Sequence, residues 1–259
     1  MKIKEDKQCK MNTAEIMTTA LCAGMYFGGN QERARMFLEE SGSIPTMLSK
    51  SQFNRRLHQI DECLWQILFS TLAHIFKKRN ATQEYVVDSF PVSACKNIRI
   101  KRCRLYRNKK HLGWCASKKE YFYGLRVAVI ATTRYEPVEI IFAPGADHDS
   151  KIFKAFNLEL PESSTLYADS AFTDYQYEDL VAEATGIRFL VTRKSNSKRP
   201  HEPWTNFFIG KVRKTIESAF SMITSLFSRS IHAVTARGFE LKIFLFILAH
   251  SFNLLIRTT

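Results

Sequence analysis

Apolar residues recur with two different periods along this chain, and the period changes near residue 80. Before that point they are spaced three or four apart, which predicts short helices interrupted at Gly28-Gly29. Asn12 or Thr13 is placed to cap the first helix and Asn30 the second, and one further helix is expected from about Ser51 to Ile75. We expect residues 1–80 to form an all-helical N-terminal region.

After residue 80 the chain has five short runs rich in β-branched and aromatic residues, which favour strands. The runs are 85–88, 121–131, 138–142, 165–168 and 187–191. The second and third are close enough to form an antiparallel hairpin. Because Pro91 cannot continue a central strand, Asp88 is expected near the C-terminal end of the first.

Helices are predicted between and after these strands. Asp149 is placed to cap one over residues 152–156, and Thr173 or Asp174 one that ends at Gly186. A helix containing Glu217 and an apolar terminal helix complete the chain. We therefore predict an α/β fold for residues 81–259, with a mixed five-stranded sheet flanked by helices.

Three acidic residues lie at positions where they could meet in one pocket. Asp88 and Asp169 each end an apolar strand and precede a serine, and Glu217 lies on a predicted helix. Three carboxylates in one pocket repel each other unless a cation joins them, and oxygen ligands suit Mg²⁺ or Mn²⁺. The alternative is structural: Asp-Ser pairs start turns readily, and Glu217 can pair with Arg213 across one helical turn.

The chain is strongly basic: 38 Lys and Arg against 25 Asp and Glu give a net charge of +13 and a pI near 9.5. This excess favours a polyanionic partner, nucleic acid before an anionic membrane. Phe239–Ile256 is the most apolar stretch, but Glu240, Lys242 and His250 interrupt it. We interpret it as a core helix and expect no membrane span.

Positive charge is concentrated in residues 96–119, which contain ten Lys and Arg and no acid. Tyr106, His111 and Trp114 lie among them. We interpret this segment as a basic insertion that follows DNA phosphates, with aromatic rings available to stack on unpaired bases; the alternative is a flexible, soluble loop.

The N-terminal region is also basic, and its helices are compatible either with helix-turn-helix-like DNA binding or with a cap on the next domain. Its cations are expected on the outside; they are Arg33, Arg35, Lys50, Arg55 and Arg56.

Six cysteines show no C-x-x-C spacing, and the charged Met1–Lys10 start shows no signal peptide, so we expect free thiols in a reducing compartment. A zinc site is a disfavoured alternative because the spacings fit no usual finger; its ligands would be Cys95, Cys103, His111 and Cys115.

Several motifs in a fixed order resemble the IS982 group of bacterial DDE insertion-sequence transposases, which have a ribonuclease-H-like catalytic fold. The resemblance runs from Tyr85 to Ile256, and the N-terminal helices match more loosely. The matching segments are Val86–Val92, Asn97–Arg99, Arg102–Tyr106, Ser117–Arg126, Ala143–Gly145, Tyr167–Asp169, Thr173–Tyr175, Asn196–Pro200, Glu217–Ser221 and Ile231–Lys242.

The resemblance implies that Asp88, Asp169 and Glu217 are the catalytic, metal-binding triad. Two Mg²⁺ ions, or Mn²⁺, are implied, with Asp88 bridging both, Asp169 on one and Glu217 on the other. Arg213 matches the basic residue one turn before the acid. The wider family signature has a Tyr and a Lys where this chain has Gly210 and Thr224, so an end-binding Lys is not carried over.

The implied activity is metal-dependent cleavage at insertion-sequence ends and strand transfer of the freed 3′-hydroxyl into target DNA. The implied partners are terminal inverted repeats, target DNA and further copies of the chain, in the nucleoid of a bacterial cytoplasm. The candidate DNA-binding residues are Arg99, Lys101, Arg102, Arg104, Arg107, Lys118, Lys119, Arg126, Lys198, Arg199 and Arg213.

Two other function classes fit the same residues. A non-transposing nuclease would use the same acids without joining strands. A non-enzymatic DNA-binding protein derived from a transposase would keep only the basic surface, although the presence of all three acids argues against decay. Arg126 either approaches a phosphate or faces solvent, and both a capping role and a place at the border of the site fit His148 and Asp149.

Overall fold

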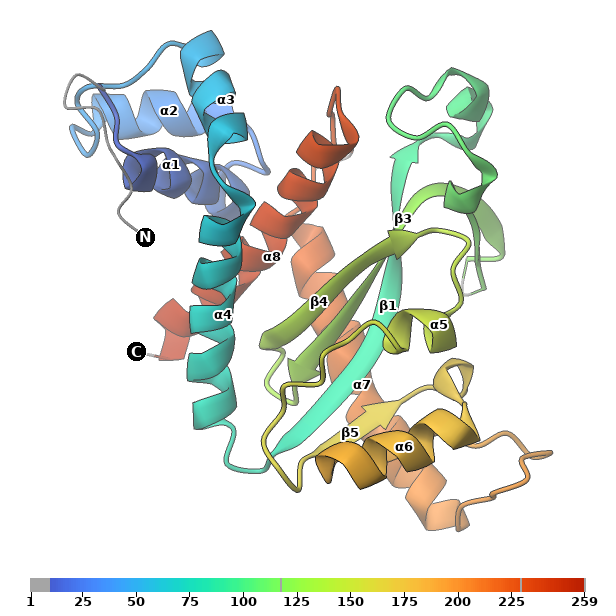
Figure 1. The fold of residues 1–259 in the computed structure, drawn as a ribbon. Coiled ribbons are helices and arrows are strands. Elements are labelled where there is room, and N and C mark those ends of the chain that lie inside the picture. The colour runs from blue at the N-terminus through green and yellow to red at the C-terminus, as the bar shows by residue number, and fades with distance from the viewer. Residues whose placement is uncertain (1–9, 117, 229, 259) are drawn as a thin grey trace. The chain divides into compact units, whose positions relative to one another are not determined.

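The computed structural model describes residues 10–116, 118–228 and 230–258, so the charged start and Cys9 lie outside the described residues. The chain groups into two compact units (Figure 1). Unit 1 comprises the residues up to Leu68 and from Met222 onward, and unit 2 comprises Phe69–Ser221. The functional division expected near residue 80 stays a prediction.

Unit 1 is helical. It contains α1 (Thr13–Tyr26), α2 (Gln31–Glu40), α3 (Lys50–Gln59), the start of α4 (Glu62–Arg79) and α8 (Ala236–Thr258). The caps predicted at Asn12 and Asn30 are confirmed, since each side chain accepts a backbone N–H of the first turn. The single helix expected from Ser51 is wrong: Ile60 has extended backbone, so two helices form with Ser49 capping α3.

The exposed position expected for Arg35 is also wrong. Its side chain is buried, where it pairs with Glu32 at 2.8 Å and donates to the carbonyl oxygen of Leu48. Arg33, Lys50 and Arg55 are exposed as expected, so they remain candidates for DNA contact.

Helix α8 packs against α1 within unit 1. Over Ala236–Arg257 its mean hydropathy is 1.7, so by length and composition alone it also passes as a membrane span, but half of that window is buried. Phe239, Ile243 and Ile247 are fully buried. This burial agrees with the core helix expected from the sequence.

Unit 2 is built on one mixed sheet. Its strands are β1 (Glu84–Cys95), β2 (Leu112–Cys115), β3 (Glu120–Thr132), β4 (Pro137–Pro144), β5 (Thr165–Ala168) and β6 (Arg188–Val191). β3 lies antiparallel to β1, β2 and β4, whereas β1, β5 and β6 are parallel neighbours. All five predicted strands are confirmed, and the short β2 inside the basic insertion is an addition.

Strand β1 does not end near Asp88, so that prediction is wrong. The strand continues through Pro91, which pairs with Arg126 of β3. β5 pairs only with residues Glu84–Val86 of β1, so β1 has an open edge from Val87 onward. A proline is tolerated at such an edge because no N–H is needed there. Asp88 therefore follows the parallel part of β1 without ending the strand.

Helices cover both faces of the sheet (Figure 1). On one face α7 (Pro203–Ser225) packs through Phe220 on Phe90, with ring centroids 4.6 Å apart. On the other, α5 (Asp149–Phe153) packs through Phe153 on Phe189 at 4.5 Å, beside α6 (Tyr175–Thr185). Three 3₁₀ turns complete the unit: η1 (Asn97–Arg102), η2 (Lys109–His111) and η3 (Ser170–Phe172).

Two of the three helix-end predictions in this unit are confirmed. Asp174 caps α6, and Gly186 ends it with a left-handed backbone at φ 67°. The cap predicted at Asp149 is wrong: His148 is the capping residue, without a side-chain bond, and Asp149 is the first helical residue. Its carboxylate accepts a hydrogen bond from Ser89 instead.

Candidate active site

Asp88 and Asp169 lie at equivalent distances beyond the paired part of two neighbouring parallel strands. Val86 of β1 is in register with Tyr167 of β5, and each aspartate lies two residues further along the chain: Asp88 within β1, and Asp169 directly after the end of β5. Residues two apart point to the same face, and adjacent strands lie about 4.8 Å apart. The sheet therefore brings the two carboxylates together on the face covered by α7.

A single guanidinium from α7 joins the two carboxylates. Arg213 Nη2 lies 3.5 Å from Asp88 Oδ2, and Arg213 Nη1 lies 3.3 Å from Asp169 Oδ1. The Arg213 side chain is 16% exposed, against 21% for Asp88 and 41% for Asp169. One positive charge thus faces two carboxylates in a partly buried setting and offsets only part of their negative charge.

Burial raises the pKa of Asp88 to about 6. The backbone N–H of Ser89, which donates to Asp88 Oδ1 at 2.7 Å, and the charge of Arg213 oppose this effect, while Asp149 and Asp169 add to it. Asp169 accepts the N–H of Ser170 in the same way, at 2.6 Å. Asp88 is therefore a carboxylate that would gain from additional positive charge.

Glu217 lies on α7 one turn after Arg213, and residues four apart share one face of a helix. Its side chain is exposed, and no polar contact within the described part of the chain joins it to either aspartate. The structure thus brings Asp88 and Asp169 together through Arg213, whereas the place of Glu217 in the triad stays a prediction.

DDE transposase domains, the class suggested by the sequence, generally use divalent metal ions. Within residues 10–116, 118–228 and 230–258, no three His, Cys, Asp or Glu side chains are gathered to hold one. The donors nevertheless fit a hard cation, because Asp88 and Asp169 offer only oxygen atoms and carry more negative charge than Arg213 offsets.

A second polar cluster lies on the opposite face of β1. Ser89 Oγ donates to Asp149 Oδ1 at 2.5 Å, and Arg126 Nη1 lies 3.3 Å from Ser89 Oγ and 3.5 Å from Asp149 Oδ1. Arg126 also donates to the carbonyl oxygen of Trp114 at 3.2 Å. We did not predict this cluster from the sequence. The available signal was the alternation of side chains along β1, which places Ser89 on the opposite face of the sheet from Asp88.

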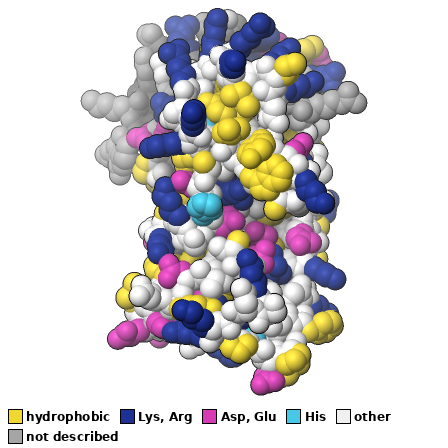
Figure 2. All heavy atoms as spheres, turned by 90° about the vertical axis from the view of Figure 1, so that its right-hand side faces the viewer, with side chains coloured by type: hydrophobic (Ala, Val, Ile, Leu, Met, Phe, Trp, Pro, Cys, Tyr) yellow, Lys and Arg dark blue, Asp and Glu magenta, His cyan; other side chains and the backbone are white. Residues whose placement is uncertain are grey.

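The candidate DNA-binding residues fall into two groups. Arg126, Arg199 and Arg213 are held by carboxylates within unit 2. The others are exposed, and within the described chain none of them pairs with a carboxylate; they are Arg99, Lys101, Arg102, Arg104, Arg107, Lys118, Lys119 and Lys198. Figure 2 shows Lys and Arg side chains gathered around hydrophobic patches on the upper part of one face.

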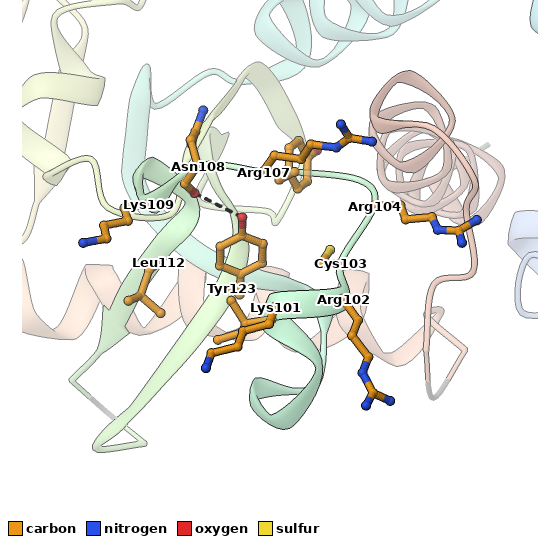
Figure 3. A pocket seen from close by; sticks show the side chains of 11 residues that line it. Lys101, Arg102, Cys103, Arg104, Arg107, Asn108, Lys109, Leu112 and Tyr123 are labelled. Atoms are coloured by element: carbon orange, nitrogen blue, oxygen red, sulfur yellow. Dashed lines mark hydrogen bonds between the residues drawn. The ribbon is translucent and has the colours of Figure 1, made fainter.

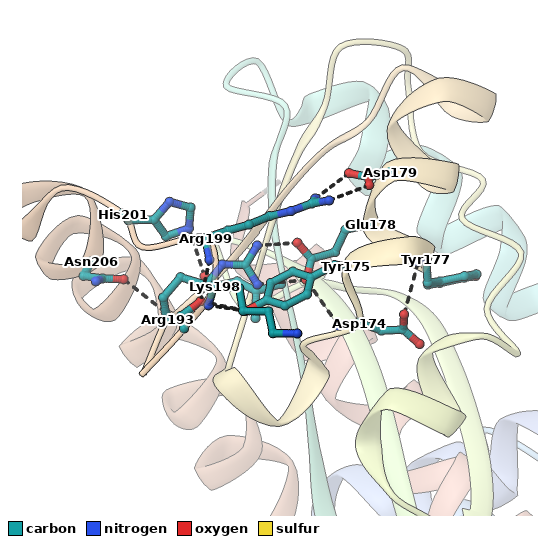
Figure 4. Close-up of polar contacts among 12 residues, drawn as sticks. Asp174, Tyr175, Tyr177, Glu178, Asp179, Arg193, Lys198, Arg199, His201 and Asn206 are labelled. Carbon is teal, nitrogen blue, oxygen red and sulfur yellow. Dashed lines mark hydrogen bonds and ion pairs between the residues drawn. The ribbon is translucent and has the colours of Figure 1, made fainter. Parts of the chain in front are cut away.

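The loop that carries Lys198 and Arg199 is anchored by polar contacts (Figure 4). Arg199 pairs with Asp179 through two bonds of 2.6 and 2.8 Å, and its guanidinium lies 5.0 Å from the centre of the Tyr175 ring. Arg193 forms a buried pair with Glu178. The segment that contains Lys198 and Arg199 is thus tied to α6, while Lys198 remains exposed.

Part of the basic insertion surrounds a pocket of about 430 Å³ (Figure 3). Tyr123 lies in its middle and donates its hydroxyl to the carbonyl oxygen of Asn108 at 3.1 Å. Five cationic side chains spread around the rim: Lys101, Arg102, Arg104, Arg107 and Lys109. The sequence predicted the charges of this region but not the pocket.

The disfavoured zinc site has no assembled ligand set among the described residues. His111 lies with Nδ1 3.2 Å from the carbonyl oxygen of Gly124, and its ring stacks on Tyr106 at 3.9 Å. Burial, with a hydrogen bond to Cys103, raises the pKa of Cys95 to about 11. The described cysteines are free thiols, as predicted.

In fold, the chain is similar to a solved structure titled as the cryo-EM structure of the piggyBac transposase synaptic complex with hairpin DNA. The TM-score is 0.53 at 10% sequence identity, over 99% of this chain and 69% of that one. No curated protein matches the sequence. The α/β fold expected from the sequence, a mixed sheet flanked by helices with a helical N-terminal region, is confirmed, with six strands in the sheet where five were expected.

Residues 79–252, which are more than half of the chain, match the family described as "Transposase DDE domain". The chain belongs to this family and is a DDE-type transposase. The matched range includes Asp88, Asp169, Arg213 and Glu217.

Proposed function

We propose that this chain is a transposase of the IS982 group that cleaves DNA at the ends of an insertion sequence. It then transfers the freed 3′-hydroxyl into target DNA. The observation that carries the proposal is that Asp88, within β1, and Asp169, directly after the neighbouring strand β5, both contact Arg213 in a DDE transposase domain.

The metal ligands would be Asp88, Asp169 and Glu217, with Mg²⁺ or Mn²⁺ as the ions and two ions per site. When bound, such ions activate the attacking oxygen and stabilise the leaving oxygen of the phosphate. Asp88 has the more buried side chain of the two aspartates and is the candidate for the bridging position. Glu217 would join from the face of α7 that it shares with Arg213, by turning its exposed side chain towards the two aspartates.

Arg213 has two roles in this proposal. In the free protein it reduces the repulsion between Asp88 and Asp169. When bound metal ions offset the charge of the two carboxylates, the guanidinium, which is 16% exposed, would be free to donate to a DNA phosphate. Arg213 would then hold the substrate beside the two carboxylates.

The substrate contacts beyond the site would come from the exposed cations of the basic insertion and from Lys198. The DNA partners would be the terminal inverted repeats and the target, as the DNA in the similar piggyBac complex suggests. Because two element ends must be joined, we propose a homo-oligomer on DNA, and we place the protein at the nucleoid of a bacterial cytoplasm.

The test is to incubate purified protein with labelled element-end DNA and Mg²⁺ or Mn²⁺, and then to separate nicked from joined products. Asp88→Ala, Asp169→Ala and Glu217→Ala should each reduce cleavage by about 10³-fold or more while DNA binding persists. Asp179→Ala is the matched control, because Asp179 is an exposed acid of the same unit that pairs with Arg199 instead of Arg213.

The outcomes separate the rival functions. Nicked products without joined ones indicate a non-transposing nuclease. Binding without any cleavage by the unaltered protein indicates a DNA-binding protein without catalysis. Cleavage that survives Asp88→Ala contradicts the proposed site.

A further inference from the structure

We propose that the exposed face of the β2–β3 hairpin binds an unpaired nucleotide of DNA. Trp114 would stack on its base, Tyr121 would support the indole through an edge-to-face contact at an interplanar angle of 64°, and the cations around the neighbouring pocket would hold the adjoining phosphates. The proposal rests on the proposed function, because it names the form of DNA that this part of the transposase recognises.

The aromatic pair is the first observation. Trp114 and Tyr121 are directly opposite each other in the antiparallel pair of β2 and β3, with ring centroids 4.8 Å apart. Trp114 is 46% exposed and Tyr121 58% exposed. Large aromatic rings held in place yet open to solvent offer stacking area to a nucleobase, since every base has a flat face.

Strand β2 behind the pair packs closely against neighbouring backbone, which holds the Trp114 ring in place. Gly113 and Cys115 face the interior. A Cβ added at Gly113 would lie only 2.1 Å from the carbonyl oxygen of Gly145, which shows how closely the two backbones pack. Arg126 donates to the carbonyl oxygen of Trp114 at 3.2 Å and also contacts Ser89, the neighbour of Asp88.

The pocket lies on the same face of the hairpin as the aromatic pair. Leu112 and Tyr123 line it, and they are the next cross-strand pair on that face. Residues two apart on a strand are separated by about 7 Å. A base stacked on Trp114 therefore places its neighbouring phosphates at the rim of the pocket.

The positive charge at the rim of the pocket favours a polyanionic partner. None of its five Lys and Arg side chains pairs with a carboxylate within the described part of the chain, so all are available to phosphates. A volume of about 430 Å³ admits a single nucleotide but not a duplex. Tyr106 is buried and stacked on His111, which leaves Trp114, supported by Tyr121, as the ring that can receive a base.

The test measures binding in EDTA, so that it does not depend on cleavage. A labelled single-stranded oligonucleotide and a duplex of the same length are titrated with protein, and affinity is read from fluorescence anisotropy. Trp114→Ala should weaken single-strand binding about fivefold or more and duplex binding by less than about twofold, because the lost interaction is base stacking. Trp114→Phe should retain most of the affinity.

Two controls make the result specific. Trp204→Ala removes another exposed tryptophan, 71% exposed on α7, and should change neither affinity. The double variant Lys101→Ala with Arg104→Ala should lower the slope of log affinity against log salt for single strands by about 1.4, whereas Trp114→Ala should leave that slope unchanged. Circular dichroism confirms that each variant is folded.

Unchanged single-strand affinity in Trp114→Ala, or an equal loss for single strand and duplex, overturns the proposal. These outcomes are independent of the catalytic assignment. Single-strand binding that depends on Trp114 in a protein that fails to cleave element ends would contradict the proposed function and leave this inference standing.

Discussion

Asp88 is the residue at which stability and chemistry conflict most clearly. Its carboxylate is 21% exposed and shares one guanidinium with Asp169. Burial raises its pKa to about 6, so the ionised form is disfavoured in the folded protein. An ionised carboxylate in this position destabilises the metal-free protein, and the same unmet negative charge is what would attract a divalent cation.

Asp88→Asn should therefore stabilise the metal-free protein at pH 7.5. An acid with a raised pKa in the folded state loses stability as the pH rises from its unfolded value to its folded value. A pKa of about 6 in place of 3.8 corresponds to roughly 2–3 kcal/mol at pH 7.5, and the difference should disappear near pH 4. Chemical denaturation in EDTA at several pH values measures it.

Asp179→Asn is the matched control for this effect. The pKa of Asp179 is lowered, chiefly by its hydrogen bonds with Arg199, so removing the charge should not stabilise the protein at neutral pH. If Asp88→Asn unfolds at the same denaturant concentration as the unaltered protein at pH 7.5, the ionised Asp88 carboxylate does not destabilise the folded protein and the prediction is wrong.

At the scale of elements, the close packing of backbones decides where β2 lies. A methyl group at Gly113 would meet the carbonyl oxygen of Gly145 at 2.1 Å and the ring of Phe122 at 2.6 Å. A backbone oxygen in a neighbouring segment cannot swing aside as the end of a flexible side chain can. Gly210, in contrast, lies inside α7 with nothing within 4 Å of an added Cβ.

Gly113→Ala and Gly210→Ala should have opposite effects on the free energy of unfolding. Gly113→Ala should destabilise by about 1–3 kcal/mol through overpacking, and it should weaken single-strand binding because β2 is displaced. Gly210→Ala should stabilise by about 0.5–1 kcal/mol because alanine loses less entropy in a helix interior. Denaturation curves give both values; a neutral Gly113→Ala would contradict the close approach.

The elements with regular periods were the ones predictable from sequence. The five predicted strands, the caps at Asn12 and Asn30, and the end at Gly186 follow from local residue types. The continuation of β1 through Pro91 did not, because the open edge that tolerates a proline depends on how far β5 pairs with β1. In the candidate site, the proximity of Asp88 and Asp169 follows from the strand pattern and their catalytic role stays a prediction, whereas the Arg213 bridge and the contacts of Asp149 depend on distant segments.

At the scale of the whole molecule, net charge is distributed unevenly. Residues 96–119 carry ten of the 38 Lys and Arg and none of the 25 acids. They account for +10 of the net +13, which leaves 28 bases against 25 acids, or +3, for the rest of the chain. The attraction to a polyanion is thus concentrated in the segment that contains the pocket and the aromatic pair.

The last prediction concerns the salt dependence of DNA affinity. Replacing five insertion cations with Gln should lower the slope of log affinity against log salt on duplex DNA by up to about 4.5, since each phosphate contact contributes about 0.9. The five are Arg99, Lys101, Arg102, Arg104 and Arg107.

A control variant changes the net charge by the same amount outside the insertion, at Arg33, Lys50, Arg55, Lys78 and Lys194, which are all exposed. If the insertion holds the phosphates, the slope of this variant should stay close to that of the unaltered protein, because net charge alone forms no contact. Equal reductions in the two variants would mean that DNA contacts extend to the N-terminal helices. That result would favour the helix-turn-helix-like interpretation of unit 1 over a purely structural one.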